Sequence, residues 1–329
     1  MDGNNSTVHF SETQTLSDKG PNQASIDLWF WIIFGAIGVV ALFGNSVVIF
    51  LITTRRRLRT ACNSFILSLS VSDLLTAVTT IPGSFICEFG VQCNNPVFWI
   101  FCNFFICASV GNICTMAADR YCRVVYPLRY PVMMSSKRIA LLIMLGWTLP
   151  IFLQFIPSLC IRLSPTLVQW IFNVIQMFTF AILPCIGLLL AYAKISRITF
   201  KHSHHQRVQV AQIHRNSTKS QLSAKVVPRK SFSVLVLGIV IFFFVLCWAF
   251  SIYRGICDSF SLCKVQLSVI LASRIFLVGN TAVNPVVYAI LKQDIRRELV
   301  RTLSSVTRRA VRVQSLHMSQ TRTAVGQSQ

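Results

Sequence analysis

Seven long apolar runs constrain the fold of this chain more than any other feature of its sequence. A helix that crosses a lipid bilayer needs about 20 mostly apolar residues. Runs of that length, separated mostly by short polar or basic connectors, occupy approximately residues 28–52, 62–86, 97–122, 138–158, 167–194, 231–255 and 265–290. The sequence therefore predicts an all-α membrane protein that folds as a seven-transmembrane helix bundle.

Composition supports a membrane protein and argues against a nucleic-acid-binding one. Only 12% of the residues are charged, against roughly a quarter in soluble domains, and the mean hydropathy is +0.61. The net charge of +21 would suggest nucleic-acid binding only if Lys and Arg lined one face or one module. They fall instead in short blocks between the apolar runs, so no nucleic-acid partner is expected.

The distribution of these basic residues predicts the orientation in the membrane. The three connectors after runs one, three and five hold 17 Lys and Arg, and the segment after Ile290 holds eight more, whereas the opposite side holds three. Basic connectors stay in the cytoplasm, so the N-terminus is predicted outside and the C-terminus inside. Residues 1–27 lack the pattern of a cleavable signal peptide and are interpreted as an extracellular tail, with a glycosylation sequon at Asn4 or Asn5.

Each of the seven apolar runs contains characteristic polar, aromatic or proline residues. Amide and ionisable groups are costly in lipid, so their presence inside a run indicates a function. The set comprises Gly44-Asn45, Leu69-Ser70-Val71-Ser72-Asp73-Leu74, Ala118-Asp119-Arg120-Tyr121, Trp147, Pro184 with Tyr192, Cys247-Trp248 and Asn284-Pro285-Val286-Val287-Tyr288.

This ordered set resembles the rhodopsin-like (class A) G-protein-coupled receptor family across essentially all seven runs. The resemblance implies a plasma-membrane receptor, not an enzyme, that passes an extracellular signal to a heterotrimeric G protein. A secondary transporter or channel is the alternative, since it too would use buried charge. Transporters show paired broken helices in corresponding halves, a pattern absent from this sequence. A faint likeness to the melanocortin and adenosine branch does not assign a subfamily.

Asp73 is a lone carboxylate near mid-membrane, where a proton, a cation or hydrogen bonds must neutralise it. In receptors this looks like an allosteric sodium site, and no other metal or cofactor is expected. A purely structural hydrogen-bonded cluster is the alternative. The oxygens around the ion would come from Asn45, Ser109, Asn280 and Asn284.

Arg120 lies at the cytoplasmic end of the third run, where Asp119 can screen its charge. The resemblance implies that Arg120 meets the G protein in the active state. Many relatives hold this arginine at rest with an acid at the base of the sixth helix. This chain has Pro228-Arg229-Lys230 there, which predicts a weak hold and appreciable basal activity.

Other residues enter the predicted activation machinery by the same resemblance. Pro285 leaves a backbone carbonyl free and gives the seventh helix a hinge, beyond which Tyr288 would swing toward Tyr192. The sixth helix lacks the family's proline two residues after its tryptophan and has Phe250 instead, which predicts a straighter helix. The full set is Asp119, Arg120, Tyr121, Leu128 as a plug into the G protein, Tyr192, Phe244, Trp248, Asn284, Pro285 and Tyr288.

The segment after the seventh run resembles the family's interfacial eighth helix. Residues 291–303 place Ile295, Leu299 and Val300 near one helical face with basic residues around them, which predicts a short cytoplasmic amphipathic helix in contact with membrane lipid. The seven-helix domain would span 28–290. Residues 304–329 are expected to form a disordered tail whose Ser and Thr could be phosphorylated by receptor kinases and recruit arrestin.

Two disulfides are predicted on the extracellular side, which is oxidising. The resemblance favours Cys93 with Cys160, although Cys93 lies slightly further out than the usual position, where Asn95 stands instead. Cys87 is a competing partner for either. Cys257 and Cys263 bracket a five-residue loop and are expected to pair locally.

The outer halves of the helices suggest a ligand class. Aligning on Arg120 puts Cys102 where amine receptors carry an aspartate, so a monoamine ligand is unlikely. Arg274 and Arg254 could bind a carboxylate or phosphate, or could form an internal salt bridge with Glu88. With Trp248 beneath them, these residues predict a pocket for a small anionic molecule or a peptide.

Overall fold

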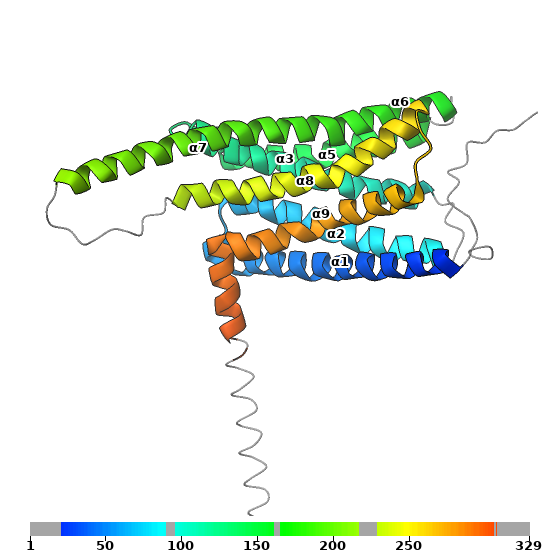
Figure 1. Ribbon diagram of the computed structural model, residues 1–329, viewed down its shortest axis with the longest axis horizontal. Coiled ribbons are helices and arrows are strands. Elements are labelled where there is room, and N and C mark those ends of the chain that lie inside the picture. The colour runs from blue at the N-terminus through cyan, green and yellow to red at the C-terminus, as the bar shows by residue number, and fades with distance from the viewer. Residues whose placement is uncertain (1–20, 90–95, 161–164, 217–228, 306, 308–329) are drawn as a thin grey trace, which may run out of the picture.

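A computed structural model describes residues 21–89, 96–160, 165–216, 229–305 and 307 of the chain, and these are almost entirely helical (Figure 1). Seven helical segments in this part are long and apolar enough to span a membrane, so the predicted number of spans is confirmed. The elements are α1 (Pro21–Thr54), η2 (Arg56–Leu58), α2 (Ala61–Phe89), α3 (Pro96–Val125), α4 (Tyr130–Met133), α5 (Ser136–Cys160), α6 (Pro165–Met177), η3 (Phe178–Ile182), α7 (Leu183–Asn216), α8 (Arg229–Phe260) and α9 (Leu267–Leu291).

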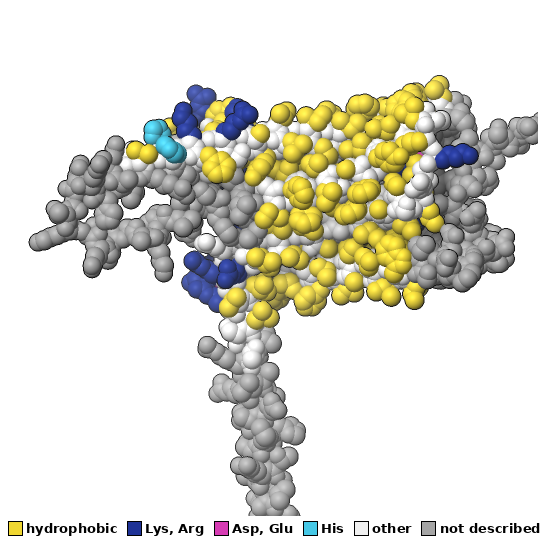
Figure 2. All heavy atoms as spheres, viewed as in Figure 1, with side chains coloured by type: hydrophobic (Ala, Val, Ile, Leu, Met, Phe, Trp, Pro, Cys, Tyr) yellow, Lys and Arg dark blue, Asp and Glu magenta, His cyan; other side chains and the backbone are white. Residues whose placement is uncertain are grey.

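The helices run side by side along one long axis. Spans one to four are α1, α2, α3 and α5; span five combines α6, η3 and α7; and spans six and seven are α8 and α9. Hydrophobic side chains form a band around the bundle, and in this view Lys and Arg lie mainly at the end from which the C-terminal helix leaves (Figure 2). This division is what a bilayer around the band and water at its ends require.

The first helix is longer than its apolar run predicts. It begins at Pro21, six residues before the end of the predicted tail at residue 27, whereas the part of it that is apolar enough to span a membrane begins at Leu28. Proline suits the first turn of a helix because a backbone N–H at that position has no partner within the helix, so its absence costs no hydrogen bond. The sequons at Asn4 and Asn5 lie outside the described residues.

A short hydrogen-bonded chain joins the middle helices. Trp147 Nε1 of α5 donates to Ser68 Oγ of α2 at 3.0 Å, and Ser68 Oγ donates to Asn112 Oδ1 of α3 at 2.7 Å. In a membrane such interhelical bonds supplement van der Waals packing, since lipid supplies no hydrophobic force between helices. Trp147, a motif residue with no assigned role in the sequence, thus ties three helices together.

Close packing of α3 against α5 depends on two glycines. A Cβ built on Gly111 would lie 2.7 Å from the carbonyl oxygen and 3.0 Å from the Cα of Gly146. Small residues at such crossings let helix backbones approach in membranes. These two glycines therefore set the spacing of α3 and α5, and with it the position of the α3 residues described below.

Gly111→Ala is expected to destabilise the protein. The added methyl group meets backbone, which cannot rotate away, so the cost should be about 1–3 kcal/mol and the thermal midpoint in detergent should fall. Gly279→Ala is the matched control, because a Cβ at Gly279 has no heavy atom within 4 Å. Equal midpoints for the two variants would contradict the glycine contact.

Span five contains a widened turn. Residues Phe178–Ile182 form a π-helix between α6 and α7, with Phe180 and Ala181 buried. Pro184 follows two residues after Ile182 and has no N–H to donate to the preceding turn, which favours such a local widening. The sequence showed Pro184 but did not predict the π-turn.

Span six runs as one helix, α8, from Arg229 to Phe260. Phe250, which replaces the family's proline, stacks on Phe276 of α9 with ring centroids 4.9 Å apart and planes 6° apart. At this position α8 therefore has an aromatic contact with α9 in place of a proline that would interrupt its backbone hydrogen bonds.

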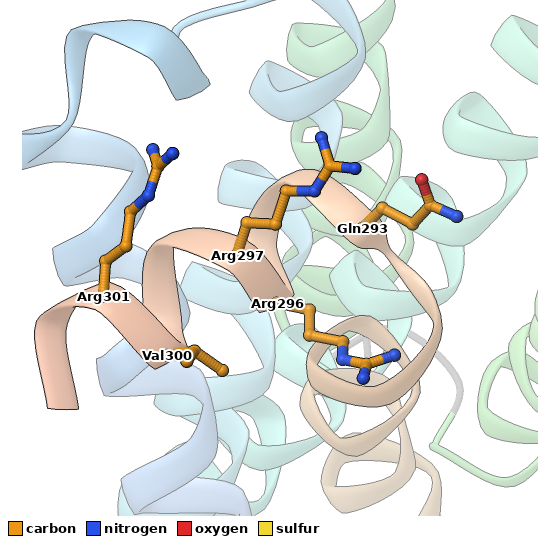
Figure 3. Close-up of a pocket in the computed structure, with 5 residues that line it drawn as sticks. All are labelled: Gln293, Arg296, Arg297, Val300 and Arg301. Carbon is orange, nitrogen blue, oxygen red and sulfur yellow. The ribbon is translucent and has the colours of Figure 1, made fainter. Parts of the chain in front are cut away.

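The short helix after α9 is present and covers residues 293–305, compared with 291–303 predicted. It turns away from the long axis of the bundle (Figure 1). Ile295 is buried against the core and Leu299 packs on it, as the sequence predicted, whereas Val300, which was predicted near the same face, is 58% exposed (Figure 3).

Candidate functional site

Asp73 sits at the centre of the bundle and is fully buried. Ser109 Oγ of α3 donates to Asp73 Oδ1 at 2.5 Å, and Asn284 Nδ2 of α9 donates to Asp73 Oδ2 at 2.8 Å. One carboxyl group of α2 thus joins α3 and α9. Two hydrogen bonds offset part of the cost of burying the carboxyl group, but they supply no opposite charge.

Two amide oxygens near this carboxyl group lack hydrogen-bond partners. They are Asn45 Oδ1 and Asn284 Oδ1, both buried. Asn45 Nδ2 donates to the carbonyls of Ala41 at 2.9 Å and Thr281 at 3.1 Å, which ties α1 to α9. Buried polar atoms are normally satisfied by protein, water or an ion. Carboxylate, amide and hydroxyl oxygens are what hard cations bind, so the residues fit the predicted sodium ion.

Asn280, the fifth predicted member of this group, is buried on α9. Its side chain makes no hydrogen bond to Asp73 among the contacts of the described residues. The structure thus brings Asp73, Ser109 and Asn284 into direct contact, with Asn45 tied to the same part of α9.

Near the end of α3 at Val125, the contacts of the described residues include no ion pair between Asp119 and Arg120, which were predicted to screen each other. Asp119 Oδ1 accepts a 2.6 Å hydrogen bond from Tyr130 Oη, and Asp119 Oδ2 lies 3.7 Å from Arg123 Nη2. Successive residues on a helix point about 100° apart, so the arginine one turn along reaches Asp119 more easily than its sequence neighbour. Burial and the hydrogen bond to Asp119 raise the pKa of Tyr130.

Arg120 is held by α2 instead. Its Nη2 lies 2.9 Å from Cys62 Sγ, and Lys292 Nζ lies 3.8 Å from the same sulfur. Lys292, just after α9, also donates to Asn63 Oδ1, and burial lowers its pKa. Arg120 and Lys292 therefore converge on the sulfur of one cysteine, a side chain that is a weak hydrogen-bond acceptor as a thiol.

The two tyrosines predicted to meet on activation, Tyr192 and Tyr288, contact other residues in this structure. Tyr288 Oη of α9 contacts Met116 Sδ of α3 at 3.4 Å. Tyr192 lies instead against α8, where a Cβ on Gly238 would be 2.4 Å from its hydroxyl oxygen. Because Gly238 has no side chain, the Tyr192 ring can pack directly against α8 at this position. The spacing of residues in the sequence did not indicate this contact.

The other predicted activation residues lie on α3, α8 and α9 or in the turn after α3. The rings of Phe244 and Trp248 pack at 5.9 Å in α8, and Trp248 Nε1 is buried without a partner. Pro285 is inside α9. The side chain of Leu128 is 94% exposed, which leaves it free for a partner. Tyr121 packs under Lys194 Nζ at 5.3 Å.

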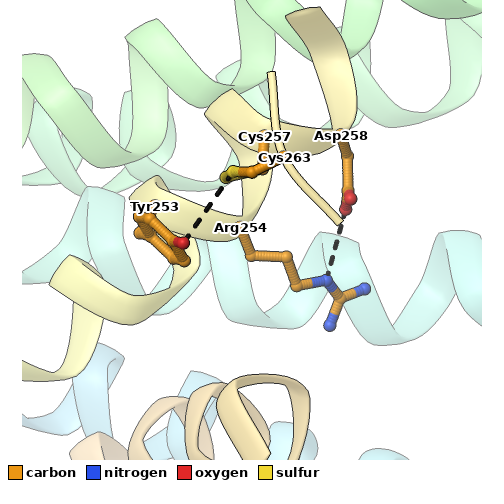
Figure 4. Close-up of a disulfide and its surroundings, with 5 residues drawn as sticks. All are labelled: Tyr253, Arg254, Cys257, Asp258 and Cys263. Atoms are coloured by element: carbon orange, nitrogen blue, oxygen red, sulfur yellow. Dashed lines mark hydrogen bonds and ion pairs between the residues drawn. A yellow bond between two sulfur atoms is a disulfide. The ribbon is translucent and has the colours of Figure 1, made fainter. Parts of the chain in front are cut away.

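Cysteines and arginines in the outer half answer part of the remaining predictions. The disulfide Cys257–Cys263 is formed, with Cα atoms 5.1 Å apart, and confirms the local pairing (Figure 4). Arg254 Nε lies 3.6 Å from Asp258 Oδ2 one turn further along α8, an acid that was not predicted as its partner. Cys93 and the side chains of Cys87, Glu88 and Cys160 lie outside the described part. Cys102 is a buried free thiol, and Arg274 is half-buried on α9.

Comparison with known proteins assigns the chain to a family. Residues 44–288 match the family described as 7 transmembrane receptor (rhodopsin family). The chain belongs to this family. It is 26% identical to the octopamine receptor beta-1R of Drosophila melanogaster, with 91% of this chain and 66% of that receptor aligned. It is 28% identical to the human histamine H2 receptor, with 80% and 76% aligned. It thus spans just under two thirds of the first relative and about three quarters of the second.

Family membership makes the chain a multi-pass receptor of the plasma membrane that couples an extracellular ligand to a G protein, rather than an enzyme. The transporter alternative is not supported. The predicted family and receptor function are confirmed, whereas the melanocortin and adenosine likeness stays untested.

Several functional contacts of the receptor were missed by sequence reasoning. Gln154 Nε2 of α5 and Gln176 Nε2 of α6 both point at Cys107 Sγ of α3, at 3.5 and 3.8 Å. A glutamine inside an apolar run is a signal that could have been noted. The sequence did not single out Cys62, because only the structure shows that Arg120 and Lys292 both contact its sulfur.

Proposed function

We propose that this receptor binds a ligand without a cationic amine, and that Arg274 contacts an anionic group of that ligand. The proposal depends on Cys102 at the position on α3 where a carboxylate would be needed to pair with an amine. A small anionic molecule or the C-terminus of a peptide is the ligand class that this chemistry favours.

The curated relatives are receptors for octopamine and histamine, so an amine ligand has to be weighed for this chain. A buried ammonium group needs an opposite charge. Within the seven spans the sequence has only three acids, Asp73, Asp119 and Asp258. Asp73 is bonded to Ser109 and Asn284, and Asp119 is cytoplasmic in position. Asp258 is paired with Arg254 near the outer end of α8. None of the three is placed to receive an amine beside Cys102.

Arg274 is the arginine proposed to contact the ligand because it is half-buried on α9, whose Phe276 stacks on Phe250 of α8. Arg254 lies near the end of α8 and pairs with Asp258 one turn away, so it serves for comparison. A guanidinium group at residue 274 could form paired hydrogen bonds with a carboxylate or phosphate.

A second-messenger screen of wild type and Arg274→Ala against anionic metabolites, peptides with free C-termini and biogenic amines tests this proposal. An anionic agonist is expected to lose at least about 30-fold in potency on Arg274→Ala, since losing one member of a buried charge pair costs about 2–5 kcal/mol. Arg254→Ala is the matched control and should change potency only a few-fold. Activation by an amine that survives Arg274→Ala would refute the proposed ligand class.

The remaining parts of the proposed function concern the two membrane faces. We infer that the N-terminus is extracellular, with a glycan at Asn4 or Asn5, and that the basic C-terminus is cytoplasmic. Arg120 and Leu128 are the proposed G-protein contacts, and receptor kinases and arrestin the proposed partners of the Ser- and Thr-containing tail. A sodium ion at Asp73 is the proposed allosteric cofactor. Cys93–Cys160 stays the proposed second disulfide.

A further inference from the structure

The last turn of α8 ends in a tightly closed loop. The backbone N–H of Leu262 donates to the carbonyl of Cys257 at 3.2 Å, and Ser261 between them has a φ of 52°. This is the Schellman arrangement that ends many helices, in which the residue just after the helix is left-handed. Glycine adopts that conformation freely, whereas a serine keeps it only where the surrounding structure imposes it.

The disulfide supplies that constraint. It joins Cys257, whose carbonyl accepts the bond from Leu262, to Cys263, the residue directly after Leu262 (Figure 4). A crosslink of this kind removes freedom that the loop regains when the bond opens. The two cysteines differ in access, because Cys257 is 2% exposed whereas Cys263 is exposed. A thiol in solution therefore reaches the bond at the Cys263 sulfur.

Span five is fastened to this same turn by one tryptophan. Trp170 Nε1 of α6 donates to the backbone carbonyl of Ser259 at 2.7 Å, and its ring meets the Phe260 ring edge to face, with centroids 6.2 Å apart. The last carbonyls of a helix have no partner within the helix, so the indole N–H satisfies one of them. We call this contact of Trp170 with Ser259 and Phe260 the outer latch.

We propose that the disulfide Cys257–Cys263 controls the outer latch. When an extracellular dithiol reduces the bond, Ser261 leaves its left-handed conformation, the last turn of α8 loosens and Trp170 loses its acceptor. The outer end of span five then becomes more mobile although no covalent link joins it to the loop. This inference rests on the proposed orientation, which places the loop outside the cell.

The reduction is a thiol–disulfide exchange. A thiolate of the dithiol attacks the exposed Cys263 sulfur, forms a mixed disulfide with it and releases the Cys257 sulfur as a thiolate. The second thiol then closes the reductant into a cyclic disulfide and releases the Cys263 thiolate. Two electrons pass to the protein, and the two protons of the dithiol end on the two cysteines. Tyr253 Oη lies 3.8 Å from the Cys263 sulfur (Figure 4), so its hydroxyl hydrogen can stabilise that departing thiolate.

Hydrogen–deuterium exchange of the purified full-length receptor in detergent, with and without dithiothreitol, tests the proposal. The amides of α6 are expected to exchange about two- to tenfold faster after reduction, which corresponds to the loss of one net hydrogen bond. Unchanged exchange in α6 would overturn the proposal, as would a Cys257–Cys263 bond that dithiothreitol leaves closed, followed by alkylation and mass spectrometry. Both faces are accessible in detergent, so this result is independent of the proposed orientation. Alkylation of the two cysteines on intact cells after a membrane-impermeant phosphine tests the orientation separately.

Trp170→Phe tests whether the tryptophan transmits the change. It keeps an aromatic ring against Phe260 but removes the indole donor, so α6 should already exchange faster and gain less than about twofold on reduction. A gain as large as in the wild type would contradict the latch. Trp147→Phe is the matched control, because it removes an indole bond to Ser68 elsewhere in the bundle and should respond to reduction as the wild type does.

Two further variants isolate the disulfide itself. Cys257→Ser/Cys263→Ser should show fast exchange in α6 that dithiothreitol does not change; a remaining response would trace the effect to another disulfide and overturn the proposal. Ser261→Gly tolerates the left-handed conformation without the bond, so its α6 should gain less on reduction than that of the wild type. It carries the comparison if Trp170→Phe does not purify, and an equal gain would count against the proposal.

Discussion

Replacing Asp73 by asparagine is expected to abolish the stabilisation of this receptor by sodium. In the wild type, a sodium concentration tenfold above the dissociation constant would contribute about 1.4 kcal/mol. That contribution should raise the thermal midpoint in sodium chloride above the midpoint in choline chloride of equal ionic strength. The variant loses the anionic ligand while keeping nearly the same volume, so its two midpoints should coincide.

Thr76→Ser is the matched control for this experiment. Thr76 is buried one turn from Asp73 on α2, and its hydroxyl donates to the backbone carbonyl of Ser72 at 2.9 Å, not to the acid. Its difference between the two salts should equal that of the wild type. A wild-type receptor with identical midpoints in both salts would favour the purely structural cluster, and a sodium effect that persists in Asp73→Asn would place the ion elsewhere.

Cys62→Asp is expected to lower signalling in the absence of agonist by about tenfold. Arg120 lies 2.9 Å and Lys292 3.8 Å from the Cys62 sulfur, so a carboxylate there would replace a weak thiol contact by a charge-assisted bond of about 1.5–3 kcal/mol. Arg120 would then be held away from the G protein. The measurement is agonist-free second-messenger output, normalised to surface expression and compared with mock cells.

Two control variants test whether the loss of basal signalling requires the new negative charge at residue 62 or only a negative charge nearby. Ser64→Asp adds the same charge two residues along α2, where the Ser64 hydroxyl contacts the backbone of Thr60, and should leave basal signalling near that of the wild type. Cys62→Ser keeps a neutral group. If Cys62→Asp and Ser64→Asp reduce the signal equally, the hold on Arg120 is not at Cys62; a wild type no more active than mock cells would contradict the weak hold itself.

The helices and their central acid could be predicted from sequence because lipid imposes a strict rule on both. Length and apolarity identify a span, and a carboxyl group such as Asp73 inside one has to find oxygens or nitrogens on neighbouring spans. Ser109 and Asn284 were therefore predictable partners. The disulfide Cys257–Cys263 was predictable because its two cysteines bracket only five residues on the side expected to be oxidising.

The partners of Arg120 and Tyr192 were not predictable for a different reason. Each of these side chains has several neighbours within reach. Which neighbour it contacts depends on differences of a few ångströms in how the helices pack. Tyr130, which bonds Asp119, comes from the connector after α3, and the place of Tyr192 depends on a missing Cβ at Gly238. Neither relation leaves a periodic trace in the sequence.

The π-turn at Phe178–Ile182 has a consequence for chimaeric receptors. One extra residue in a turn rotates everything on its outer side by about 100° relative to a regular helix. Gln176 reaches Cys107 from the outer side of this turn. Grafting α6 alone from a relative that lacks the extra residue would aim the wrong side chains at α3, so a functional exchange has to carry the segment from Gln176 to Pro184 as one piece.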